Sequence, residues 1–157
     1  MKALTVRQPW AWAITTGEKT IENRTTNWRH RGPLLIHAGA AYSQRGIDSD
    51  LIHDLWQRQF GWDYENTLTL TLGAIIGQVD LVGVHRAEPG CCESPWAERV
   101  YTEASGKIRR SIQHLELENA RSYGFDPIEC LGRLGLWDVD DDVLEEVARR
   151  EAVINRG

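Results

Sequence analysis

Residues 72–84 carry the strongest β-strand signal in the chain, and they constrain the fold more than any other segment. The run LGAIIGQVDLVGV is aliphatic and β-branched, but Gly73, Gly77 and Gly83 interrupt it. Glycine inside a strand often marks a bulge or a tight bend at the corner of a barrel. The segment therefore predicts a long strand that bends within a barrel.

Weaker patterns before and after this strand predict both strands and helices. Pro9 begins a short helix and Gly17 ends it, as proline and glycine do at opposite ends of helices. Apolar spacing predicts two more helices, and alternation or apolar runs predict further strands. These are helices at 43–60 and 143–153 and strands at 4–6, 20–24, 34–38, 111–117 and 134–139. A polar turn is expected near residues 63–66. Residues 87–107, with two prolines and two glycines, predict a long irregular loop.

Helices inserted between strands without regular βαβ alternation predict the α+β class. A length of 157 residues suits a single domain over residues 1–157. The core is expected over about residues 3–138, followed by an acidic C-terminal helix over 139–157. The chain contains no long apolar run, and its first residues do not resemble a signal peptide. We therefore expect a cytoplasmic protein without a membrane span.

Three cysteines, Cys91, Cys92 and Cys130, do not form a disulfide framework or a C-x-x-C metal motif. A zinc site made of His85 and these cysteines is conceivable, but adjacent cysteines rarely serve one tetrahedral ion well. The acidic run at 138–142 is typical of a solvated helix start. We therefore expect no metal and no cofactor.

Positive charge is concentrated at the start of the chain. The whole chain has a net charge of −5, yet residues 1–46 hold seven lysines and arginines against two glutamates. A local basic zone on an acidic protein indicates a confined anion site rather than a broad surface for duplex DNA. We therefore do not expect long duplex DNA as a partner. The alternative interpretation of the basic zone is that its arginines are solvated surface charges.

Two stretches resemble the opening of ASCH domains, whose signature is a G-x-K-x-x-E-x-R core in a PUA-like barrel. They are LTVRQPW at residues 4–10 and GEKTIENR at residues 17–24. RGPLLIHA at 31–38, the strand from 73 to 85 and GRLGLW at 132–137 continue the resemblance.

The resemblance implies a mixed β-barrel of five to six strands, with a helix closing one end, related to PUA, EVE and YTH modules. It also implies a cleft, lined by the K-x-x-E-x-R residues, that receives RNA or a modified base. Some members are described as ribonucleases, some as amidohydrolases that remove the acyl group from acetylated cytidine, and others as RNA-binding or coactivator-associated modules. Fold alone does not choose among these activities.

Strand alternation places Glu22 and Arg24 on one face and Ile21 on the other, so the two charged side chains should enter the cleft together. Lys19 precedes them in the turn. Arginine suits a phosphate, lysine suits a phosphate or an oxyanion, and a desolvated lysine can act as a base. In the acylcytidine amidohydrolases a Lys-Thr-x-Thr-x-Arg run supplies a nucleophilic threonine, but Glu22 stands at the second threonine position here. Catalysis would then fall to Lys19, with Glu22 as general base. The alternative is a surface salt bridge.

Aromatic and polar residues near this motif are further candidates for ligand binding. Trp10 and Trp28 are candidates for stacking on a base, whereas Trp12 and Trp56 are expected in the core. The remaining candidates are Arg7 and Gln8, near the start of the first helix, and His37, at the end of an apolar strand.

The leading hypothesis is an ASCH-type domain that binds single-stranded RNA or a modified nucleoside through Arg7, Gln8, Trp10, Lys19, Glu22, Arg24, Trp28 and His37. The first alternative is a metal-independent hydrolase that uses the same cleft, either a ribonuclease or an acylated-cytidine amidohydrolase. The second is a protein-interaction adaptor that uses the acidic C-terminus or the 87–107 loop.

Overall fold

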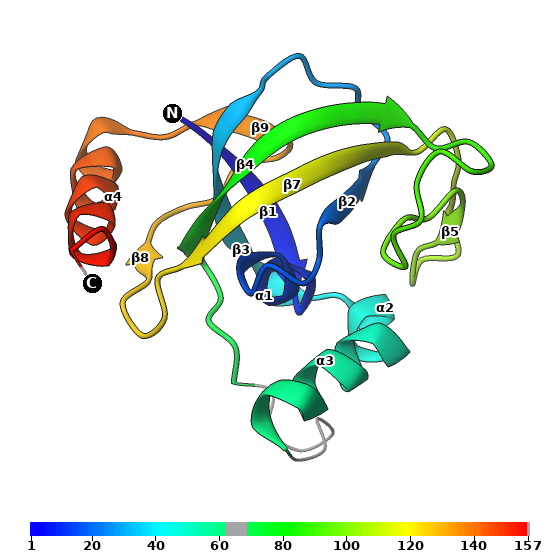
Figure 1. Cartoon of the computed structure of the whole chain (residues 1–157), viewed down its shortest axis with the longest axis horizontal. Helices are drawn as coiled ribbons and strands as arrows, with labels where there is room; N and C mark the ends of the chain where they lie inside the picture. The colour runs from blue at the N-terminus through cyan, green and yellow to red at the C-terminus, as the bar shows by residue number, and fades with distance from the viewer. Residues whose placement is uncertain (62–68, 157) are drawn as a thin grey trace.

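A curved, mostly antiparallel sheet forms the centre of the fold in the computed structural model, which describes residues 1–61 and 69–156 (Figure 1). Its strand order is β2-β7-β4-β3-β1-β9, with β8 also paired to β4. Only β1 and β3 run parallel among these pairs. The strands are β1 (Lys2–Gln8), β2 (Ile21–Arg24), β3 (Gly32–Tyr42), β4 (Ala74–Arg86), β7 (Gln113–Ser122), β8 (Ile128–Glu129) and β9 (Leu136–Asp138).

The predicted α+β class is confirmed, but the predicted barrel is not closed. Over the described residues, the sheet ends at β2 on one side and at β9 on the other, and these edges do not pair. Both edge strands are short, with four and three residues. A side chain makes the connection that a backbone ladder would make in a closed barrel, because Arg24 of β2 donates to the Thr5 carbonyl of β1 at 2.9 Å.

In the part of the chain that the structure describes, four helices lie around the sheet: α1 (Trp10–Thr15), α2 (Gln44–Ile47), α3 (Asp50–Phe60) and α4 (Asp141–Ile154). The single helix expected over 43–60 is wrong, because the chain breaks into α2 and α3 near Asp48 and Ser49. Ser43 caps α2 through its side chain, and Ser49 adopts extended backbone at the start of α3. Serine favours helix starts over helix interiors, which explains the break.

Among the described residues, three apolar clusters hold these layers together. The largest packs Ala11 and Ile14 of α1 against the inner face of the sheet, where Leu34, Ile36 and Leu115 are fully buried. The second joins α1 to α3 and contains Trp12 and Trp56, whose ring centroids are 5.2 Å apart. The expectation that both tryptophans are core residues is confirmed. The third cluster seats α4 near β8 and β9, on the side of the sheet away from α2 and α3 (Figure 1).

The irregular character of residues 87–107 is largely confirmed. This segment contains the short strand β5 (Tyr101–Thr102), which pairs with β6 (Ile108–Arg109) just beyond it. The turn expected near residues 63–66 lies outside the described residues. None of the described helices combines the length and the apolar character needed to cross a membrane.

Glycines allow β4 to bend and to be approached closely, as the sequence predicts. The β4–β7 register shifts twice, between Gln78 and Asp80 and between Leu81 and Gly83. At Gly77, a Cβ atom would lie 2.3 Å from the Arg121 carbonyl oxygen of β7 and 2.8 Å from a Thr15 methyl carbon of α1. The absence of a side chain therefore lets α1 and β7 both approach β4.

Gly77→Ala should lower the free energy of unfolding by about 1–3 kcal/mol, because the nearest obstacle is backbone and cannot rotate away. Gly39→Ala in β3 is the matched control, since its Cβ would meet nothing closer than 3.4 Å. Urea denaturation of the two variants measures the difference. Equal midpoints for both would contradict this account of the α1–β4–β7 packing.

Candidate functional site

A cleft of about 800 Å³ opens where the sheet fails to close. One side is formed by β1 and by the segment before β9, and the other by β2 with the 87–107 loop and α2. The charged and aromatic side chains that line it are Arg7, Trp10, Lys19, Glu22, Arg24, Arg45, Trp96, Glu98, Tyr101, Glu103 and Arg109. The open edge of the sheet is thus the location of the candidate site.

Lys19 lies at the base of this cleft and is only 3% exposed. It follows α1 after Gly17, whose φ of +86° suits glycine, and its backbone N–H donates to the Ala13 carbonyl. The ammonium group donates to the Ile21 carbonyl and lies 3.1 Å from a Glu22 carboxylate oxygen. It also lies 5.6 Å and 5.7 Å from the ring centroids of Trp10 and Trp96. Two indole faces and one carboxylate therefore stabilise the buried cation.

Glu22 uses its two carboxylate oxygens for two different cations. One oxygen faces Lys19, and the other accepts from Arg24 Nε at 2.9 Å. Burial by itself would raise the pKa of Glu22, but the Lys19 and Arg24 cations outweigh it and hold the pKa below its ordinary value of 4.5. Glu22 is therefore an anion at neutral pH with both oxygens already engaged.

A second group of polar residues comes from the 87–107 loop and α2. Arg45 makes a bidentate pair with Glu98, at 2.8 and 2.9 Å, and its guanidinium lies 4.2 Å from the Tyr101 ring centroid. Asn23 of β2 donates to the Trp96 carbonyl and accepts from the Glu98 N–H. The loop is thus fastened to β2 as one wall of the cleft.

Sequence reasoning did not find Asn23, Arg45, Trp96, Glu98 and Tyr101. Asn23 lies between Glu22 and Arg24 inside the G-x-K-x-x-E-x-R core, so its place in the motif could have identified it as a cleft residue. Trp96, Glu98 and Tyr101 lie in a segment with no periodicity, and no pattern connects them to β2.

The charges in the cleft are largely balanced. Five cationic side chains and three carboxylates line it, and all except Arg7 belong to ion pairs in the part of the chain that the structure describes. Arg7 is exposed at the rim. The cleft is therefore polar with a modest positive excess, rather than uniformly basic.

Arg7, Trp10, Lys19, Glu22 and Arg24 are the predicted site residues that the structure brings together in the cleft. Gln8 does not line it. The Gln8 side chain is buried, where it accepts from the Trp12 N–H at 2.9 Å and donates to the Thr71 carbonyl at 3.0 Å. It therefore fastens the first turn of α1.

His37 also lies outside the residues that line the cleft. It is buried, donates from Nε2 to the Cys130 carbonyl at 3.0 Å, and meets the Trp137 ring edge-on. Burial lowers the pKa of His37, so the ring is neutral at neutral pH. A Cβ at Gly132 would lie 2.4 Å from this ring. The first glycine of GRLGLW thus makes room for His37, which supports the segment leading into β9.

Trp28 is partly buried against the main core cluster and close to Gly135. Its carbonyl accepts from Arg31 at 2.9 Å. It is not among the residues that line the cleft. The aromatic neighbour of Trp10 in the cleft is Trp96, with the two rings edge-to-face at 6.3 Å.

Comparison of the sequence with known families identifies the family of the chain. The profile of the ASCH domain matches residues 4–128, which is most of the chain. The chain belongs to the ASCH domain family. No curated protein matches it.

Solved ASCH structures from Zymomonas mobilis share the fold of this ASCH chain. The wild-type protein aligns with a TM-score of 0.51 and 13% identity, covering 94% of this chain and 93% of that one. Two mutants of the same protein give TM-scores of 0.54 and 0.53 at 12% identity, with 94% of this chain covered and 96% and 94% of the others. At such low identity, the similarity establishes the fold of the ASCH domain and not its substrate.

Glu22→Gln should destabilise this ASCH domain by about 3–5 kcal/mol at neutral pH, because it leaves Lys19 as a buried cation without its carboxylate. Since the folded-state pKa of Glu22 is depressed, its contribution is present above the unfolded pKa and is lost as pH falls through the folded pKa. The difference between wild type and variant should therefore shrink as the pH falls below about 4.5.

Urea denaturation between pH 3 and pH 7 measures this difference, at about one-unit steps. Glu118→Gln is the control, because Glu118 is an exposed carboxylate on β7. A Glu22→Gln variant as stable as wild type at pH 7 would contradict the role assigned to the Lys19–Glu22–Arg24 cluster.

Proposed function

We propose that this ASCH domain binds single-stranded RNA or a modified nucleoside in the cleft between β1, β2 and the 87–107 loop. The observation that carries the proposal is the convergence of Lys19, Arg24 and Arg7 with Trp10 and Trp96 on one cleft. Its volume of about 800 Å³ lies within the range of pockets that enclose small organic ligands. Cations beside aromatic side chains are the combination that single-stranded nucleic acid and nucleobases require.

Charge balance favours a base or nucleoside over a long run of phosphates. Lys19, Arg24, Arg45 and Arg109 each face a carboxylate already, so their attraction for further anions is reduced. Arg7 is the cation with spare hydrogen-bonding capacity at the rim, where it suits a single phosphate. Arg24 retains further N–H donors, and each Glu22 oxygen retains a second lone pair beside its cation, so the edge of a base could still be bound at the base of the cleft.

A hydrolase that uses the same cleft is the second candidate function. The buried ammonium of Lys19 is suited to stabilise a developing oxyanion in a desolvated site. Glu22 is less suited as a general base, because both of its oxygens accept from cations and its pKa is low. These contacts favour recognition over proton abstraction, and they leave Lys19 as the residue on which catalysis would depend.

Arg7→Ala should weaken the binding of a short single-stranded RNA by about tenfold, the loss expected for one charge-assisted phosphate contact. Wild-type affinity should depend only weakly on salt, with a slope of log K against log salt near −0.7 for one phosphate. Fluorescence anisotropy measures both quantities. Arg149→Ala on α4 is the matched control, since it removes the same charge far from the cleft. Equal affinities for the two variants would place RNA binding elsewhere.

Mass spectrometry on a short RNA pool that includes acetylated cytidine separates binding from chemistry. The pool is incubated with wild type and with Lys19→Ala, and both free and retained RNA are weighed. Recognition alone predicts intact RNA in both samples, with the preferred base enriched in the RNA retained by the wild type. A mass change that requires Lys19 would instead establish the hydrolase, and its size would separate deacylation from strand cleavage.

A further inference from the structure

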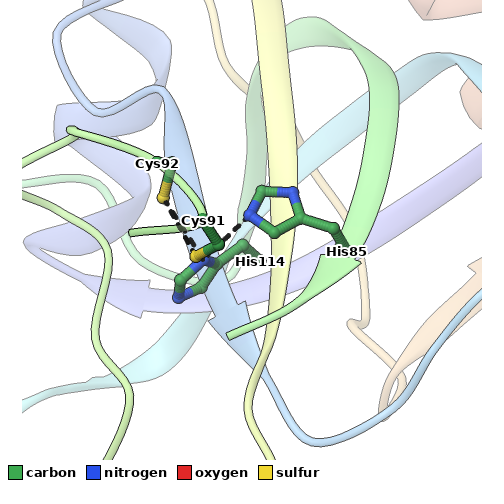
Figure 2. Close-up of side chains that lie close together, drawn as sticks. All are labelled: His85, Cys91, Cys92 and His114. Atoms are coloured by element: carbon green, nitrogen blue, oxygen red, sulfur yellow. Dashed lines mark hydrogen bonds between the residues drawn. The ribbon is translucent and has the colours of Figure 1, made fainter. Parts of the chain in front are cut away.

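Two histidines and two cysteines meet at the end of the sheet next to the 87–107 loop (Figure 2). His85 is the residue before the last of β4 and His114 is the second residue of β7, and the strand register places them directly opposite each other. Cys91 and Cys92 approach from the loop, with their sulfur atoms turned toward the two rings (Figure 2). All four donor atoms lie within 4.8 Å of one another.

Four of the six distances among these atoms match the edges of a tetrahedron around zinc, and the other two, between His85 and the two cysteines, are at most 4.8 Å. With Zn–S bonds of about 2.3 Å and Zn–N bonds of about 2.05 Å, tetrahedral angles give separations of about 3.8 Å for S···S, 3.6 Å for S···N and 3.3 Å for N···N. The two sulfurs are 3.7 Å apart, and His114 Nδ1 lies 3.5 Å from Cys91 Sγ and 3.4 Å from Cys92 Sγ. His114 Nδ1 and His85 Nε2 are 3.2 Å apart.

The outer hydrogen bonds orient both rings as ligands. His114 Nε2 lies 2.9 Å from the Glu98 carbonyl, which can only accept, so the tautomer of a neutral His114 that makes this bond has its proton on Nε2 and a bare Nδ1. His85 Nδ1 lies 2.6 Å from a Glu116 carboxylate oxygen. A neutral His85 that donates there presents a bare Nε2. Two nitrogen lone pairs then face each other at 3.2 Å, an arrangement that a shared cation stabilises.

We propose that His85, Cys91, Cys92 and His114 bind one zinc ion. Thiolate and imidazole donors in a tetrahedral set are characteristic of zinc, and a histidine that donates its other N–H to a carboxylate or a carbonyl is the usual outer arrangement. Four protein ligands leave no open position, so the zinc is structural rather than catalytic. Two thiolates also balance the charge of Zn²⁺.

A zinc ion at this site would be contrary to the expectation from the sequence that the chain holds no metal. The fourth ligand is His114 rather than Cys130. Cys130 instead packs against the apolar cluster that seats α4. The adjacent cysteines can both take part, because their sulfur atoms are separated by a full tetrahedral edge. Gly83 also matters, since a Cβ there would lie 2.6 Å from the Glu116 carboxyl carbon and would displace the group that orients His85.

The zinc would connect the sheet to the wall of the cleft. Glu98, whose carbonyl accepts from His114, is the same residue whose carboxylate pairs with Arg45 and whose N–H donates to Asn23. A metal that fixes Cys91 and Cys92 to β4 and β7 therefore holds the 87–107 loop at both the metal site and the cleft. This role does not depend on which ligand the cleft binds.

Elemental analysis of the full chain, purified without chelator and dialysed, should give close to one zinc per molecule. Cys91→Ser and Cys92→Ser should each reduce the zinc content severalfold, whereas Cys130→Ser should retain it. Because Cys91 is exposed, its replacement removes a ligand without disturbing the core. Replacement of zinc by Co²⁺ should produce the visible absorption bands of tetrahedral cobalt bound to thiolates, and Cys91→Ser should weaken them.

Limited proteolysis reports the structural role independently. Removal of zinc should increase cleavage within residues 87–107 in the wild type, and restored zinc should reverse the increase. A wild-type chain without zinc as purified, which also takes up neither Zn²⁺ nor Co²⁺, would overturn the proposal. Equal zinc content in wild type, Cys91→Ser and Cys92→Ser would overturn it as well.

Discussion

The site depends on the ion pairs that the Glu22 carboxylate makes with two cations from different parts of the fold. Lys19 belongs to the turn after α1, whereas Arg24 reaches across the open edge to the Thr5 carbonyl of β1. Buried charges are tolerated only when they are paired and hydrogen-bonded. The same cluster therefore allows the turn to be buried, bridges β2 to β1 and leaves a polar floor for the cleft.

The open sheet is compatible with a stable fold because the Arg24 side chain joins β2 to β1 where no backbone pairing does. A backbone ladder between β2 and the β1–β9 side would fill the space that now forms the cleft. Arg24 makes the connection with one side chain, so the edges stay apart while the layers remain joined. The cleft therefore lies at the open edge of the sheet, where the buried Lys19–Glu22–Arg24 cluster joins β2 to β1 without pairing their backbones.

Sequence alone identifies the parts of the fold that local chemistry determines. The glycines of β4 predict its bends, and the K-x-x-E-x-R spacing predicts that Glu22 and Arg24 enter the same cleft. The break between α2 and α3 was also within reach, since Ser43 and Ser49 are good helix starts. Whether the barrel closes could not be predicted from the sequence, because closure depends on how the short edge strands β2 and β9 are placed relative to each other. His37 and Gln8 have polar side chains near the motif, yet contacts from distant segments place them in the interior.

Sequence patterns predict little about the 87–107 loop beyond its irregularity. The loop contributes residues both to the cleft and to the proposed zinc site, so the two lie near each other. Neither Trp96 nor Glu98 belongs to a periodic segment, so only the folded chain reveals that they form a wall of the cleft. That wall has little regular structure to hold it, and its order must come from specific bonds at particular points. Asn23 and Arg45 supply such bonds on the cleft side, and His114 supplies one to the Glu98 carbonyl on the other. A metal ion beside His114 would add the one element that an irregular loop lacks, which is a rigid attachment to the sheet.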